Sequence, residues 1–255
     1  MSSSIPAPIL DAFARAHSSW HPHLTAGLEA MMRAQPSYLP QLAGDAYLPT
    51  EQRLFAAFAL PLDKVRYVLV GEGPYPRAES ATGVCFMDGA VGELWCASGL
   101  SKPVNKATSL RNFMKMLLVA DQRLQSGNTG GAALAPIAAQ LEAHGNIKTL
   151  AQLQDNLMAQ GFLLLNASLV FRHHVAPAID AKAWLPFLDT VLQALLPVAP
   201  TLVLWGKIAE QLKKLPCTAG FPQVASEHPY NLSFIDHVDM QNLFRPMRLL
   251  HCGEK

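Results

Sequence analysis

Short apolar runs alternate with longer stretches of helical periodicity along this chain. Residues 65–70 and 161–166 are β-branched or leucine-rich runs that end at a glycine or a polar residue, which is typical of buried strands. Similar runs predict strands at 201–204 and 221–225. Helical spacing predicts helices at 11–33, 51–60, 110–125, 182–195, 208–215 and 240–250. This alternation predicts a three-layer α/β/α sandwich with a central four-stranded parallel sheet.

The segments outside these elements differ in character. Residues 1–10 are rich in serine and proline and are expected to be mobile. Residues 77–108 are expected to be mostly irregular, and loops of this length usually serve as functional loops or lids. Residues 121–158 are interpreted as an extended helical insertion containing two short helices. At 255 residues and half apolar, the chain should form one large domain or at most two small ones, and residues 1–255 are interpreted as a single domain.

Composition narrows the classes of function. The net charge of +1 gives no global basic field, so any nucleic-acid binding must depend on a local patch. The four cysteines lie far apart without a C-x-x-C pair, so we expect no metal site and no cofactor. Free thiols and no recognisable signal peptide predict a cytoplasmic protein. Prolines interrupt the most apolar window, 184–205, so we expect no membrane association. We also expect the protein to be a monomer.

Polar side chains follow three of the four predicted strands. Glu72 and Tyr75 lie in the Gly/Pro-rich corner 71–76 after the first strand, Asn166 ends the second, and His228 follows the fourth. The carboxyl ends of parallel strands share one edge of a sheet, where ligands bind, so these residues are expected to converge on one cleft. Taken singly, Asn166 is also an ordinary strand terminator, and His228 is also an ordinary solvated turn residue.

Five blocks occur in the order in which they occur in the uracil-DNA glycosylases, and the chain most resembles the classical type of that family. Its corner 71–76 is similar to the family's water-activating loop G-Q-D-P-Y-H. Residues 83–86 are similar to G-L-C-F, residues 163–167 match L-L-L-N-A, and residues 228–233 match H-P-S-P-L-S. Residues 102–110 lie where the family has a proline-rich loop. The resemblance runs from about Trp20 to the terminal helix.

The resemblance implies a DNA-repair glycosylase, which flips a nucleotide into a pocket and hydrolyses the N-glycosidic bond of uracil or a related base. Phe86 would stack on the base, although by itself it is equally well interpreted as a core aromatic. Asn166 would read the N3–H and O4 of uracil with its amide, and Tyr75 would exclude the thymine methyl group. His228 would donate to O2 as negative charge develops on the leaving base.

The resemblance also implies single- or double-stranded DNA as the partner. Leu232 would wedge into the base stack, and Tyr230 offers an aromatic platform for a base. Lys102, Lys106 and Arg111 place positive charge where the phosphates of DNA would lie. An ordinary solvated basic surface would have the same residues. The residues assigned to DNA contact are Lys102, Lys106, Ser109, Tyr230, Leu232 and Ser233.

The corner departs from the family pattern at its catalytic carboxylate. Gly73 and Pro76 stand where the family has its catalytic Asp and terminal His, and neither side chain can orient water. Losing a positioned acid–base group typically costs ~10²–10⁴-fold in rate. Glu72 is the candidate substitute, because the thermophile-type branch of the superfamily has a G-E-[AG]-P-G loop with a catalytic Glu. The alternative is a carboxylate that only faces solvent.

Three functions therefore remain open. The first is a uracil-excising enzyme with Glu72 and His228 as its catalytic residues. The second is a catalytically inactive or weakly active glycosylase-fold protein that binds DNA or a modified base. The third is a protein-interaction scaffold that uses residues 121–158.

Overall fold

The computed structural model describes residues 4–141 and 145–252. The chain divides into two compact units. The first unit comprises Met1–Gly89, Gly161–Val203 and Ile208–Gln223, and the second comprises Ala90–Gln160, Leu204–Lys207 and Val224–Lys255. The boundary passes through the strands β5 (Thr201–Trp205) and β6 (Gln223–Ser226).

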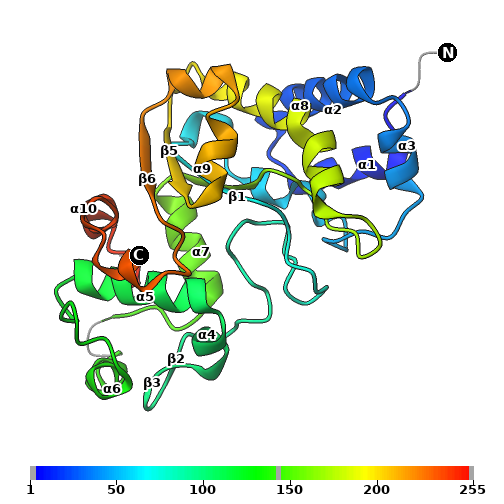
Figure 1. The fold of residues 1–255 in the computed structure, drawn as a ribbon. Coiled ribbons are helices and arrows are strands. Elements are labelled where there is room, and N and C mark those ends of the chain that lie inside the picture. Colours follow the sequence, from blue (N-terminus) through cyan, green and yellow to red (C-terminus); the bar gives the residue numbers. More distant parts are fainter. Residues whose placement is uncertain (1–3, 142–144, 253–255) are drawn as a thin grey trace. The chain divides into compact units, whose positions relative to one another are not determined.

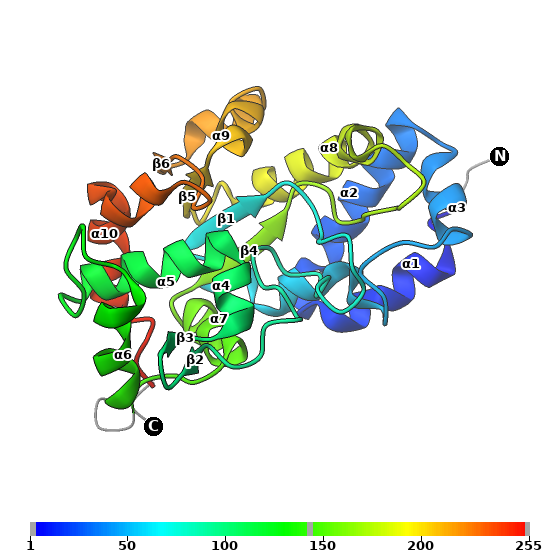
Figure 2. The same ribbon diagram turned by 60° about the horizontal axis from the view of Figure 1, so that its bottom comes forward.

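The sheet has the strand order β4-β1-β5-β6 (Figure 1, Figure 2). β1 (Tyr67–Gly71) and β4 (Phe162–Asn166) are parallel, and their register places Gly71 opposite Asn166. Every residue of β4 is buried, as expected for a strand covered on both faces. The four strands predicted from the sequence are confirmed to within one or two residues, and so is the predicted fold class.

In the first unit, the helix α2 (His21–Ala34) packs along the helix α8 (Pro177–Leu195), and Gly27 of α2 lies against the ring of Phe187. A Cβ at Gly27 would lie 2.7 Å from Cδ2 of Phe187, so a glycine is needed for this close approach. The helical elements associated with this unit are α1 (Ala7–Asp11), η1 (Ala12–Arg15), η2 (Ser18–Trp20), α2 (His21–Ala34), α3 (Tyr38–Ala43), η3 (Arg53–Ala59), η4 (Leu62–Lys64), α8 (Pro177–Leu195), α9 (Lys207–Leu212) and η5 (Pro216–Gly220).

Two sequence predictions for this unit need correction. Residues 1–10 were expected to be mobile; residues 1–3 lie outside the described residues, and in the rest of this range α1 begins at Ala7 and fully buries Ile9. The helix predicted at 51–60 is a 3₁₀ helix that begins only at Arg53, because Glu51 and Gln52 adopt left-handed backbone conformations (φ 59° and 57°). Both errors arise where tertiary packing overrides a weak local signal.

The second unit is built around α5. Its elements are β2 (Trp95–Cys96), β3 (Gly99–Leu100), α4 (Lys102–Lys106), α5 (Thr108–Ala120), α6 (Gly131–Ala139), α7 (Leu150–Ala159), η6 (Leu232–Asp236), α10 (Val238–Phe244) and η7 (Arg245–Met247), with the ends of β5 and β6. Residues 77–108 are therefore less irregular than predicted, because a hairpin and α4 form in their second half. The two short helices predicted within 121–158 are confirmed as α6 and α7.

An aromatic cluster joins the elements of the second unit. The ring of Phe113 on α5 lies 5.1 Å from that of Phe244 and 5.6 Å from that of Trp205, measured between centroids. Trp205 also contacts Phe234 of η6, edge to face, at 5.4 Å. Each such pair adds about 0.5–1.5 kcal/mol beyond burial of area. Among the helices described, none is long and apolar enough to cross a membrane.

Candidate active site

In the first unit, the sheet itself fixes the corner that follows β1. Beyond the paired Gly71 and Asn166, the Ala167 N–H donates to the Gly71 carbonyl (2.8 Å), and the Ser168 N–H donates to the Glu72 carbonyl (3.1 Å). The ladder thus continues past the ends of both strands. The backbone of the corner is therefore set by the register of β1 and β4.

The Asn166 amide is a buried polar group at the end of β4. Only 4% of the residue is exposed. Among residues 4–141 and 145–252, no group forms a hydrogen bond with its side chain. Buried amides in proteins normally have partners, and an exception calls for an explanation. The amide carries both a donor and an acceptor, and so can pair with a ligand that presents the complementary pair.

Gly71 and Cys85 hold this amide in place by packing. A Cβ at Gly71 would lie 2.5 Å from Cys85 Sγ and 2.9 Å from Asn166 Oδ1, so these two side chains fill the space above the glycine. The Cys85 N–H donates to the Leu164 carbonyl at 3.0 Å. Burial raises the pKa of the Cys85 thiol to about 12, so it is a neutral packing group at neutral pH.

Tyr75 and Phe86 are brought together beside this corner. The Tyr75 hydroxyl donates to the Phe86 carbonyl at 3.4 Å, and burial raises the pKa of Tyr75 well above its ordinary value, so the hydroxyl stays protonated. Phe86 adopts a left-handed backbone conformation (φ 67°), which non-glycine residues rarely adopt and which costs about 1–3 kcal/mol. Such strain is concentrated at functional sites.

The carboxylate of the corner is placed differently. Glu72 is exposed, and its side chain makes no hydrogen bond or ion pair with the part of the chain that the structure describes. Gly73 does not adopt a left-handed conformation, and a Cβ there would meet only Ser168, at 3.7 Å or more. Position 73 can therefore accept a side chain, so the backbone of the corner does not require a glycine there.

In the second unit, His228 begins a tight turn after β6. The Tyr230 N–H donates to His228 Nδ1 at 3.1 Å, and the Asn231 N–H donates to the His228 carbonyl at 2.9 Å. Because Nδ1 accepts, the neutral imidazole carries its proton on Nε2, which is then a donor. Gly206 at the end of β5 makes room for this turn, because a Cβ there would lie 2.9 Å from His228 Cβ.

The buried side chain of Asn112 anchors this turn to α5. Its amide nitrogen donates to the carbonyls of Pro229 (2.8 Å), Tyr230 (3.3 Å) and Asn231 (3.4 Å). The Arg111 Nε donates to Asn112 Oδ1 at 3.3 Å, which orients the amide, and its Nη1 donates to the Asn105 carbonyl at 3.2 Å. Arg111 thus links α4, α5 and the turn.

The predicted DNA-contacting residues lie on two exposed features of the second unit. Lys102 and Lys106 are exposed, four residues apart on α4, and Ser109 lies in the first turn of α5. Unpaired N–H groups at a helix N-terminus favour anions. Ser233 is exposed, and Tyr230 and Leu232 are each 67% exposed, which is unusual for large apolar side chains.

The predicted site residues therefore fall into two groups. Tyr75, Phe86 and Asn166 lie with Glu72 around the corner of the first unit, and the remaining residues belong to the second unit. Sequence reasoning gave no individual role to Cys85, Asn112 or Gly206, and it considered Gly71 only for its small size beside Glu72. Only Asn112 could have been noticed in the sequence. It is a polar residue four positions before the apolar Met116, and therefore lies on the buried face of α5. In the described residues, no group of three His, Cys, Asp or Glu side chains is placed to hold a metal ion.

Fold and site together define an α/β protein with a buried amide at the carboxyl end of a strand in a parallel sheet. No family model matches the chain. A uracil-DNA glycosylase from Nocardioides sp. is 31% identical over 193 residues, which cover 75% of this chain and 68% of that protein. The crystal structure of wild-type UNG from Nitratifractor salsuginis has a TM-score of 0.90 and 38% identity, covering 99% of this chain and 100% of that one.

The chain belongs to the uracil-DNA glycosylase family. The crystal structure of the mimivirus uracil-DNA glycosylase, with a TM-score of 0.55 and 16% identity over 88% of this chain and 73% of that one, shares the fold. The family resemblance found in the five sequence blocks is thereby confirmed.

Proposed function

We propose that this protein is a DNA glycosylase that hydrolyses the N-glycosidic bond of uracil, or of a related base, after flipping it out of DNA. The observation that carries the proposal is the buried, unpartnered amide of Asn166 in a member of this family. A carboxamide donates to uracil O4 and accepts from N3–H. It rejects cytosine, which presents the opposite pattern at these two positions.

Phe86 and Tyr75 complete the base-reading group. Phe86 stacks on the flipped base, and its strained backbone, with the carbonyl bonded to Tyr75, fixes its position. Tyr75 forms the wall beside C5 and leaves no room for the methyl group of thymine. The tight packing of Gly71, Cys85 and Asn166 makes this group rigid before the base arrives.

His228 stabilises the leaving base. Its Nε2–H donates to uracil O2, where negative charge develops as the glycosidic bond breaks. A neutral donor suffices, because its hydrogen bond strengthens as that charge grows. Leu232 fills the gap in the base stack, while Tyr230, Ser233, Ser109, Lys102 and Lys106 contact the DNA.

Glu72 supplies the carboxylate that the sugar cation and the attacking water require. It is the acidic residue next to Gly73, which has no side chain, and its own exposed side chain has no competing partner in the described residues. A carboxylate next to an oxocarbenium-like sugar both stabilises positive charge and accepts a proton from water.

The test is single-turnover excision with the enzyme in excess over uracil-containing DNA, single- and double-stranded. Wild-type protein should yield abasic sites that are cleaved by alkali, and matched strands with cytosine or thymine should yield none. Asn166→Ala should lose excision while its unfolding temperature stays close to that of the wild type, because the amide has no protein partner to lose. Abasic product from Asn166→Ala at the wild-type rate contradicts the assignment.

A second candidate function is base or DNA binding without catalysis. The absence of a side chain at Gly73 and the exposure of Glu72 favour it. A binder of this kind shows uracil-dependent affinity, or plain salt-sensitive affinity for DNA, with no abasic product. Gly73→Asp separates the two functions, because it should give a binder measurable activity, and the space around position 73 allows the change.

A monomeric state, a cytoplasmic location, the preference between single- and double-stranded DNA and the single-domain organisation of residues 1–255 remain predictions. So does a role for residues 121–158 as a partner surface, which a pull-down with and without this segment would test.

A further inference from the structure

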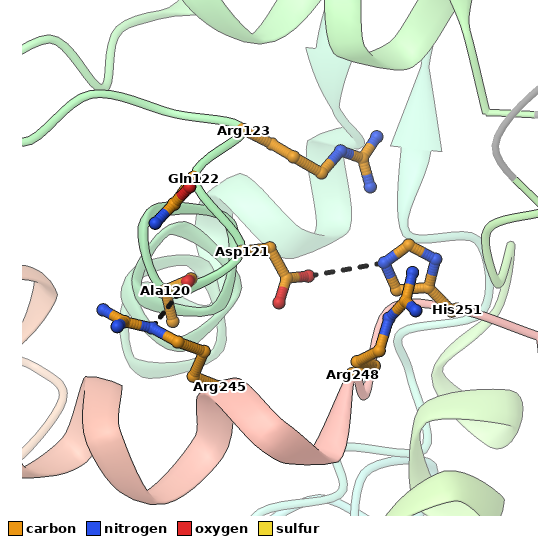
Figure 3. Close-up of a pocket in the computed structure, with 7 residues that line it drawn as sticks. All are labelled: Ala120, Asp121, Gln122, Arg123, Arg245, Arg248 and His251. Carbon is orange, nitrogen blue, oxygen red and sulfur yellow. Dashed lines mark hydrogen bonds and ion pairs between the residues drawn. The ribbon is translucent and has the colours of Figure 1, made fainter.

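A basic pocket lies at the C-terminal end of α5 in the second unit (Figure 3). Its volume is about 340 Å³, and the charged side chains that line it are Asp121, Arg123, Arg245, Arg248 and His251. Ser109 lies at the opposite end of α5. A helix of 13 residues is about 20 Å long, so the pocket is separate from the predicted phosphate contacts around Ser109.

Positive charge exceeds negative charge in this pocket. Three arginines and one histidine line it with a single carboxylate, that of Asp121. Asp121 Oδ2 lies 3.6 Å from Nε2 of His251, and both side chains are largely buried. Burial raises the pKa of Asp121, and the neighbouring His251, Arg123 and Arg248 oppose that shift. Arginine stays charged at any physiological pH.

The three arginines differ in what they already do. Arg245 Nε donates to the Ala120 carbonyl at 3.1 Å and so caps α5, and Figure 3 shows its guanidinium on the far side of the helix end from His251. Arg123 Nη1 donates to Asn146 Oδ1 at 2.8 Å, which leaves other N–H groups of its fork. The guanidinium groups of Arg123 and Arg248 both lie beside the Asp121–His251 pair in Figure 3.

Arg248 has two features expected of a ligand-binding residue. It is exposed, and its backbone adopts a left-handed conformation (φ 48°), which an arginine rarely adopts. Strain of this kind is retained where the surrounding structure demands a particular side-chain position.

We propose that this pocket binds a phosphate group, taken either from the DNA backbone or from free phosphate. Two neighbouring guanidinium forks match the oxygens of a phosphate, which they can bind in a bidentate manner. A metal cation is excluded by the permanent positive charge of the arginines. Asp121 pairs with His251 and also interacts with the charges of Arg123 and Arg248, so a bound phosphate shares these two arginines with one carboxylate.

The first experiment measures thermal unfolding of the full chain in sodium phosphate and in sodium chloride at equal ionic strength. For a free-phosphate site, phosphate at 100-fold above its Kd should raise the Tm of the wild type by at least about 5 °C. Arg123→Gln/Arg248→Gln should lose this shift, and so, at least in part, should Arg248→Gln alone, whose exposed side chain is replaced without risk to folding. Lys213→Gln/Lys214→Gln, which removes two exposed lysines with no assigned DNA contact, is the matched control and should keep the shift.

The second experiment distinguishes the two sources of phosphate. Binding of a uracil-free duplex is measured over a range of salt concentrations for the same variants. If the pocket takes a DNA phosphate, the slope of log K against log salt should fall by about 0.9 for each DNA phosphate that a variant no longer neutralises. An unchanged slope together with the disappearance of the phosphate-induced Tm shift assigns the pocket to free phosphate.

The proposal is overturned if the arginine variants match the wild type in both experiments. Neither readout uses excision of uracil, so a failure here is distinguishable from a failure of the glycosylase assignment. Excision from single-stranded DNA, measured in parallel, reports on that assignment separately.

Discussion

The corner after β1 and the turn at His228 carry complementary chemistry but are stabilised in different ways. At the corner, Asn166 is 4% exposed and is fixed by strand register and by packing against Gly71 and Cys85. At the turn, Tyr230 is 67% exposed, and one buried side chain, Asn112, holds the backbone. In the proposed function, base reading is thus built into the sheet, and the turn proposed to contact DNA is tied to α5 through Asn112.

This difference predicts how substitutions should act. Changes to the packing at Gly71 or Cys85 should alter base recognition and folding stability together, because these residues pack tightly against Asn166. Asn166→Ala should alter recognition alone, because no described residue bonds to its amide. Changes at exposed positions of the turn should alter catalysis with little effect on stability. Substitution of Asn112 should lower both stability and activity, with a smaller effect on activity than substitution of His228.

The largest effect is expected at the exposed turn. His228→Ala should lower the single-turnover rate of uracil excision by ~10²–10³-fold, the typical cost of one donor to a developing oxyanion. The Tm should change little, because His228 is exposed. His173→Ala, another exposed histidine, is the control and should leave the rate unchanged. A His228→Ala variant as fast as the wild type would remove His228 from the mechanism.

The next effect tests the packing of the corner. Gly71→Ala places a methyl group 2.5 Å from Cys85 Sγ, so it should displace Asn166 and cost ~10²-fold in rate, with about 1–3 kcal/mol of stability. In Gly71→Ala/Cys85→Ala the nearest Cys85 atom is Cβ at 3.6 Å, but Asn166 Oδ1 stays 2.9 Å from the new methyl group, so the double variant should recover part of the stability loss and less of the rate loss. A double-mutant cycle measured by excision rate and by denaturant unfolding checks this coupling. Strictly additive effects would mean that Cys85 does not position Asn166.

A smaller effect is expected at the anchor. Asn112→Ala leaves the carbonyls of the turn without their donor and should cost about 1–3 kcal/mol, with a roughly tenfold lower kcat. Asn112→Asp should be worse than Asn112→Ala, because a carboxylate of similar size cannot donate and would face the same carbonyls. Urea unfolding and steady-state kinetics measure both, and equal behaviour of the two variants would contradict the anchoring role.

The mildest test is chemical labelling of thiols at pH 7.5. Burial raises the pKa of Cys85 to about 12, whereas hydrogen bonding to Ser98 lowers the pKa of the exposed Cys96. Iodoacetamide should therefore modify Cys96 readily and Cys85 only after unfolding, because the thiolate is the reactive form. Mass spectrometry of peptides gives the order, and early labelling of Cys85 in the folded protein would show that the corner opens.

The sequence predicted the parts of the fold that depend on regular patterns. The buried runs that became β1 and β4 could be recognised, and so could the ligand edge at Asn166 and the strand-end position of His228. Residues that act through packing could not be recognised in this way. Gly71 matters because of Cys85, which is near it only in the fold, and Asn112 matters because a turn more than 100 residues away rests on it.

The sequence also could not predict local backbone strain. The left-handed conformations of Glu51, Gln52 and Phe86 are imposed by their surroundings, and no residue type at those positions signals them. The exposure of the Glu72 side chain is a further property of the folded corner, since a turn can direct a side chain either way.

The central claim is that the base-reading corner works with Glu72 as its carboxylate. The most direct measurement is the single-turnover rate of uracil excision for the wild type, Glu72→Gln and Glu72→Gln/Gly73→Asp. We expect excision by the wild type, a loss of ~10²–10⁴-fold in Glu72→Gln, and recovery when the carboxylate is placed at position 73. Excision by Glu72→Gln at the wild-type rate, or no abasic product from the wild type at any enzyme excess, would contradict it.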